Sequence, residues 1–162
     1  MSATSALRPP AFSRRTLLGT SAAGLALLVT GCTASPADVR ETVTSEQADE
    51  LAAQLGVQEA LVAAYVAAGK ADPALAASVT ELAAQAREQL DRLRAAAPNT
   101  TPSPTPSAGA APAGAAAKGW LRQQVAAAAT SHATACLDQS GPRAALLGSI
   151  AAGLRGQDGL LA

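Results

Sequence analysis

The amino-acid sequence predicts an all-α protein, a small alanine-rich four-helix bundle made of two helical hairpins after an N-terminal signal segment. Two observations lead to this fold class. Of the 162 residues, 44 are alanine, the residue with the highest helix propensity. Larger apolar residues recur every three or four positions in four segments, and turns containing Gly or Pro separate these segments. Because alanine buries little area per contact, we expect the bundle to be marginally stable.

The composition excludes several classes of protein. Aromatic residues make up 2% of the chain and there is one histidine, which excludes an aromatic-lined nucleic-acid platform and a histidine-rich metal site. Two cysteines are too few for a disulfide scaffold. Twelve basic and twelve acidic residues give a net charge of zero, so the sequence offers no electrostatic reason to bind nucleic acid.

Residues 1–31 are typical of a cleavable export signal. Arg8, Arg14 and Arg15 precede an uncharged apolar run from Leu17 to Thr30, and no acidic residue intervenes. The run is shorter than the roughly 20 residues that span a bilayer as a helix, which favours a signal peptide over a permanent membrane helix. The pair Arg14-Arg15 resembles the twin-arginine export motif. Leu17 stands where many such signals have phenylalanine, so the general secretory route stays open.

The apolar run is followed by Val29-Thr30-Gly31-Cys32, which resembles the bacterial lipobox. The resemblance implies that the Cys32 sulfur receives a diacylglyceryl group and that cleavage makes Cys32 the mature N-terminus. Two acyl chains, such as palmitate, at about 0.8 kcal/mol per buried methylene, give stable anchoring. We therefore expect a lipid-anchored protein on the extracytoplasmic face of the cell membrane, with residues 32–44 as a lipidated tether. The alternative is a chance cysteine among small residues.

Residues 45–97 predict the first helical hairpin. Thr44 and Gln47 have capping-box spacing at the start of a helix that ends near Gly69. Asp72 is the expected cap, and Pro73 the first residue, of a single second helix that ends before Pro98. The turn is short, so the two helices are antiparallel. Their apolar stripes are Leu51, Leu55, Val62, Tyr65 and Val66 in the first helix, and Leu75, Val79, Leu82, Ala86, Leu90 and Leu93 in the second.

Residues 98–117 read as an uncharged linker rich in Pro, Ser, Thr and Ala, which cannot bury enough apolar surface to fold. It is a flexible crossover or, alternatively, an O-glycosylated stalk. Residues 118–162 predict the second hairpin, with one helix from Lys118 to Leu137 and another opened by Gly141-Pro142. The apolar stripes are Leu121, Val125, Ala128, His132 and Cys136, then Leu146, Leu147, Ile150, Leu154 and Leu161.

The order of these features resembles a known group of proteins. The twin-arginine-like signal, the lipobox, a hairpin ending in the run from Gln85 to Arg94, the Pro-rich crossover and the run from Leu146 to Ala152 are similar to actinobacterial exported lipoproteins with a ferritin-like domain of unknown function. That resemblance covers about residues 46–162. It implies a di-iron site of Glu and Glu-x-x-His in the core. This sequence has no Glu-x-x-His, so we expect the metal ligands to be lost.

The sequence offers three weak candidates for a metal site, namely His132, Cys136 and Glu59. His132 and Cys136 are four residues apart and share a helix face, and Glu59 is the acidic residue expected opposite them. Two such ligands are half of a structural zinc set. A cysteine nucleophile with His132 as base would lack a third, orienting group. We therefore expect no metal, no cofactor and no catalytic residue, with His132 as a hydrogen-bonded core residue and Cys136 as a buried, unpaired thiol.

The sequence thus predicts a membrane-anchored lipoprotein of the cell envelope, carrying a non-catalytic helical module. Its partners are the membrane, through the diacylglyceryl group on Cys32, and an unknown envelope protein, with no nucleic acid. The alternative is a ferritin-like metal-binding or redox protein whose site has eroded.

Overall fold

The computed structural model describes residues 43–97 and 109–162, and within these ranges the chain forms helices and no strand. The helices are α2 (Ser45–Ala71), α3 (Pro73–Ser78), α4 (Thr80–Ala96), α5 (Ala116–Ala135) and α6 (Gly141–Leu160). They belong to one compact unit, Glu41–Ala162, called here the helical unit. The all-α fold class is confirmed. The predicted signal, the lipobox, Cys32 and most of the linker lie outside the described residues.

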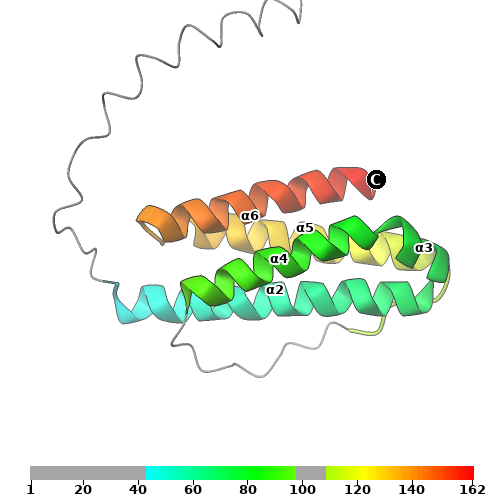
Figure 1. Ribbon diagram of the computed structural model, residues 1–162, viewed down its shortest axis with the longest axis horizontal. Helices are drawn as coiled ribbons and strands as arrows, with labels where there is room; N and C mark the ends of the chain where they lie inside the picture. The colour runs from blue at the N-terminus through cyan, green and yellow to red at the C-terminus, as the bar shows by residue number, and fades with distance from the viewer. Residues whose placement is uncertain (1–42, 98–108) are drawn as a thin grey trace, which may run out of the picture. The chain divides into compact units, whose positions relative to one another are not determined.

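The long helices of the helical unit lie side by side (Figure 1). α2 packs against α3, α4 and α5, while α6 packs mainly on α5 and also meets α4. Two hydrogen bonds between distant segments show in which direction α5 runs relative to α2. Gly114 N donates to Ala71 O at 3.2 Å, which places the start of α5 at the end of α2. Gln139 Nε2 donates to Gln47 O at 2.9 Å, which places the α5–α6 turn at the start of α2. α5 therefore runs antiparallel to α2 and parallel to α4.

α2 begins as the sequence predicts. Gln47 N donates to Thr44 Oγ1, and Thr44 N donates to Gln47 Oε1, both at 3.2 Å, so the capping box is confirmed. The helix runs two residues beyond the predicted end at Gly69. Gly69 lies where α2 and α3 approach closely, because a Cβ there would stand 3.1 Å from Ala76 Cβ.

The single helix predicted after Pro73 is wrong, since the chain forms α3 and α4 with a break at Val79. Asp72 caps α3 as expected, because its Oδ1 accepts from Ala74 N at 3.0 Å. Hydroxyls on both sides of the break bond helix carbonyls: Ser78 Oγ to Leu75 O, and Thr80 Oγ1 to Ala76 O. Such bonds compete with the helical backbone pattern and bend helices. Despite the break, every residue of the apolar stripe predicted for this segment, from Leu75 to Leu93, is buried.

In the second half, α5 begins at Ala116, two residues earlier than expected. Gly114 adopts φ +64°, a left-handed conformation that favours glycine, in the turn before it. α5 ends at Ala135, two residues before the expected end near Leu137, and Leu137 lies in the turn with 82% of its surface exposed. α6 opens at Gly141-Pro142 as predicted.

The core combines leucine with alanine. The buried apolar side chains follow the predicted stripes, except that Val66 is 42% exposed and Leu55, Val62, Cys136 and Leu146 are only partly buried. Among the described residues, α2 is long and apolar enough to cross a membrane, with a mean hydropathy of 1.4 over 18 residues. Half of that window is buried inside the helical unit. A central core helix has the same composition, and α2 packs on three of the other helices.

Candidate functional site

The most unusual feature of the core is a set of buried polar side chains. Gln58 and His132 are 0% exposed, Gln157 is 2% exposed and Gln54 is 4% exposed. Burying an amide or an imidazole is costly unless it is hydrogen-bonded, so the partners of these groups decide what they do. With Gln85, Gln89, Tyr65 and Ser131, these residues make up what we call the polar cluster.

Gln58 of α2 is the centre of the polar cluster. Its Nε2 donates to Ala86 O at 2.9 Å and to Gln89 Oε1 at 3.1 Å, both on α4. Its Oε1 lies 3.0 Å from His132 Nε2 on α5. Since an amide oxygen only accepts, this network assigns the imidazole proton to His132 Nε2. One side chain thus joins three helices.

The other nitrogen of His132 has no partner. Nδ1 is buried, and no group of the described residues forms a hydrogen bond with it. Burial lowers the pKa of His132 from 6.5 to about 4, because desolvation disfavours the charged imidazolium. The imidazole is therefore neutral at pH 7, with a free lone pair in the core.

Two further sets of bonds extend the polar cluster along the helices. Toward the start of α2, Ser131 Oγ donates to Gln54 Oε1 at 3.1 Å, and Gln54 Nε2 donates to Glu50 at 2.9 Å. Toward its end, Tyr65 Oη donates to Gln157 Oε1 at 2.8 Å. Burial raises the pKa of Tyr65, which stays protonated. The polar cluster therefore crosslinks α2 to α5 at one level and α2 to α6 at another.

The structure does not bring His132, Cys136 and Glu59 together. Glu59 pairs with Arg94 Nη2 at 3.0 Å, and Cys136 Sγ donates to Ala144 O at 3.1 Å. The residue that faces His132 is Gln58, not Glu59, because neighbours in a helix point about 100° apart. Within the described ranges, no three His, Cys, Asp or Glu side chains lie close enough to hold a metal ion.

Sequence reasoning missed the glutamines. Gln54 and Gln58 stand between Leu51 and Leu61 at spacings of three, four and three, which continue the apolar stripe to Tyr65. The helical period would have placed both in the core, but a stripe defined by apolar residues leaves amides out.

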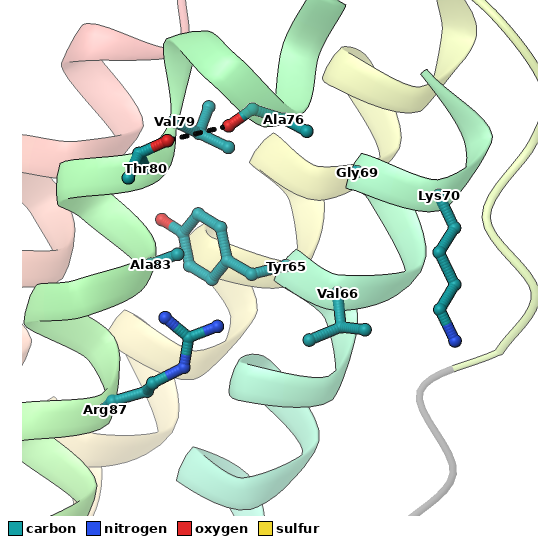
Figure 2. A pocket seen from close by; sticks show the side chains of 9 residues that line it. All are labelled: Tyr65, Val66, Gly69, Lys70, Ala76, Val79, Thr80, Ala83 and Arg87. Atoms are coloured by element: carbon teal, nitrogen blue, oxygen red, sulfur yellow. Dashed lines mark hydrogen bonds between the residues drawn. The ribbon is translucent and has the colours of Figure 1, made fainter. Parts of the chain in front are cut away.

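A surface hollow lies between the end of α2 and the start of α4 (Figure 2). Its volume is about 290 Å³, and small and apolar residues line it together with the polar side chains of Lys70, Thr80 and Arg87. Figure 2 shows the Arg87 guanidinium beside the Tyr65 ring, whereas Lys70 extends away from it along the other side of α2. The Thr80 hydroxyl is bonded to Ala76 O. The two cations do not converge, so the hollow has no ready set of ligand-binding groups.

Comparisons with known proteins returned no match to a protein-family model, a curated protein or a solved structure.

Proposed function

We propose that the protein is a membrane-anchored lipoprotein of the bacterial cell envelope and that its helical unit is a non-catalytic interaction or structural module. The observation that carries the proposal is Val29-Thr30-Gly31-Cys32, directly after a basic segment and an uncharged apolar run. A diacylglyceryl group on Cys32 would give stable anchoring, since two acyl chains bury many methylenes.

The chemistry of the polar cluster supports a non-catalytic role. General acid–base catalysis needs a group that titrates near the working pH and reaches a substrate. His132 is fully buried with a pKa of about 4, and Gln54, Gln58, Gln89 and Gln157 do not ionise. The polar cluster therefore supplies hydrogen bonds between helices rather than proton transfer.

The anchor is tested by mass spectrometry of the N-terminal peptide from the membrane fraction of expressing cells. The expected peptide begins at Cys32 and carries a diacylglyceryl group. Cys32→Ala should leave the membrane fraction, whereas the matched variant Cys136→Ala should stay in it. An intact Met1 with an unmodified Cys32 would overturn the proposal.

We further propose that the helical unit is a four-helix bundle with ferritin-like connectivity, in which α3 and α4 form one arm. Bundles of that kind have one long crossover. Here the chain leaves α4 at the end where α2 begins and enters α5 at the opposite end, as the Gly114–Ala71 hydrogen bond indicates. The crossover must therefore span the length of the bundle.

This connectivity makes the alternative worth testing, namely a metal-binding or redox protein with an eroded site. The polar cluster lies at the centre of the helical unit, and His132 Nδ1 keeps a free lone pair. A neutral imidazole is a common metal ligand, but the amides beside it are weak ligands for transition metals. Metal analysis of the purified protein should find well below one equivalent of Fe, Mn, Zn or Cu. Stoichiometric metal that His132→Leu abolishes would favour the alternative.

A further inference from the structure

The helical unit has two different ends. At the end where α2 begins, here called the proximal end, the α5–α6 turn lies against the first turn of α2 through the Gln139–Gln47 hydrogen bond. At the other, distal end, α6 finishes, and Lys118 Nζ donates to Ala162 O at 3.0 Å. Figure 1 shows that the start of α2, the end of α4 and the α5–α6 turn share the proximal end.

The proximal end carries unburied apolar surface. Leu137 is 82% exposed in the α5–α6 turn, and Val43 is 44% exposed just before α2. A hollow of about 290 Å³ opens here, lined by Val43, Gln47, Ala96, Ser140, Pro142 and Arg143. Burying one large apolar side chain is worth about 1.5–3 kcal/mol, so this surface favours an apolar partner.

The same hollow is lined by a guanidinium with one buried nitrogen that has no hydrogen-bond partner. Arg143 Nη1 is buried, and within the described ranges no group accepts a hydrogen bond from it. A guanidinium presents a planar fork of N–H donors that matches the oxygens of a phosphate. Ser140 makes no side-chain cap at the start of α6, so the free backbone N–H groups of the 20-residue helix add positive potential nearby. The hollow therefore pairs apolar walls with an unsatisfied donor for an anionic oxygen.

The connection to Cys32 indicates which surface meets this end. Val43 follows Cys32 by eleven residues, which reach at most about 40 Å when fully extended. The distal end is separated from the proximal end by the length of α2. Because α2 has 27 residues and rises 1.5 Å per residue, this length is about 40 Å. A lipid on Cys32 therefore lets the proximal end meet the bilayer at any extension of the tether, whereas an upright bundle brings its distal end there only when the tether is almost fully extended.

We propose that the proximal end docks on the phospholipid surface of the membrane, with Leu137 and Val43 in the interfacial region and Arg143 on a headgroup phosphate. The proposal rests on the lipid anchor proposed above. Glu46 and Asp138 also lie exposed at this end and oppose attraction by net negative charge. Docking therefore uses apolar contact and the phosphate that all phospholipids share.

The test uses the full lipidated protein in phosphatidylcholine vesicles whose acyl chains carry bromine, which quenches tryptophan on contact. Leu137→Trp and Leu160→Trp are compared, each in a Trp120→Phe background. Leu160 is the matched control, since it is 73% exposed and lies at the distal end. We expect brominated lipid to lower the fluorescence of Leu137→Trp at least about twofold, as for an interfacial side chain, and to leave Leu160→Trp unchanged.

Flotation of the same vesicles separates the two proposals. A protein that floats with equal quenching at both positions, or with none at Leu137→Trp, overturns the docking while the anchor stands. A protein that does not float overturns both. Arg143→Gln, added to Leu137→Trp, should reduce the quenching, whereas Arg155→Gln, on the exposed face of the same helix, should not. Unchanged quenching in Arg143→Gln overturns the phosphate contact.

Discussion

α4 and α5 both pack against α2, yet they bury different side chains. α4 buries Leu82, Leu90 and Leu93 with one alanine. Most of the buried residues of α5 are alanines, and its polar one is His132. Leucine holds neighbouring helix axes apart, while alanine lets them approach. The packing of α4 therefore depends on side-chain volume, and that of α5 depends on close approach and on the hydrogen bond to Gln58.

The largest expected effect on stability comes from the buried leucines of α4. Leu93→Ala, at a position that is 0% exposed, should lower the free energy of unfolding by about 2–5 kcal/mol, because a cavity replaces the side chain. Urea unfolding followed by circular dichroism measures the loss. Leu137→Ala is the matched control, and its exposed side chain should leave stability within about 0.5 kcal/mol. Equal losses in the two variants would show that Leu93 is not packed as described.

In α5, the contribution of His132 to the free energy of unfolding is expected to depend on pH. The pKa of His132 is about 4 in the folded protein against 6.5 when unperturbed, so between these values the unfolded chain binds more protons. The stability that this difference provides is fully present above about pH 6.5 and is lost as the pH falls through about 4. It amounts to about 3 kcal/mol. Unfolding free energies measured from pH 7 to pH 4 should fall by about this much, and in His132→Leu the decline across this window should largely disappear.

The hydrogen bond between Gln58 of α2 and His132 of α5 can be measured directly. Gln58→Leu leaves the imidazole N–H of His132 and the amide oxygen of Gln89 without the partner that Gln58 supplies, at a cost of about 1–3 kcal/mol. Each single variant leaves one member of the Gln58–His132 hydrogen bond buried without its partner. The double variant with His132→Leu removes both members, so neither is left unpaired. The two losses should therefore combine with a coupling of about 0.5–3 kcal/mol. Gln123→Leu, on the exposed face of α5, is the control. Strictly additive losses would mean that the 3.0 Å contact does not hold the helices together.

The sequence predicted well the features that depend on local chemistry. The starts of α2, α3 and α6 follow from a capping box, from Asp72 with Pro73, and from Gly141-Pro142, where a few neighbouring residues fix the backbone. It failed where distant packing decides. The break at Val79 depends on how two hydroxyls turn toward carbonyls, and the pairing of Gln58 rather than Glu59 with His132 depends on helix rotation.

The smallest expected effect compares the starts of α2 and α6. Thr44 accepts a hydrogen bond from Gln47 N at 3.2 Å, whereas Ser140 makes no such bond at the start of α6. Thr44→Ala should therefore lower the free energy of unfolding by about 1 kcal/mol, and Ser140→Ala should change it by less than about 0.5 kcal/mol. Urea unfolding of both variants tests the difference. Losses of the same size would mean that the serine hydroxyl also satisfies an N–H group of its helix in solution. The first turn of α6 would then have no free N–H groups to add to the charge of Arg143.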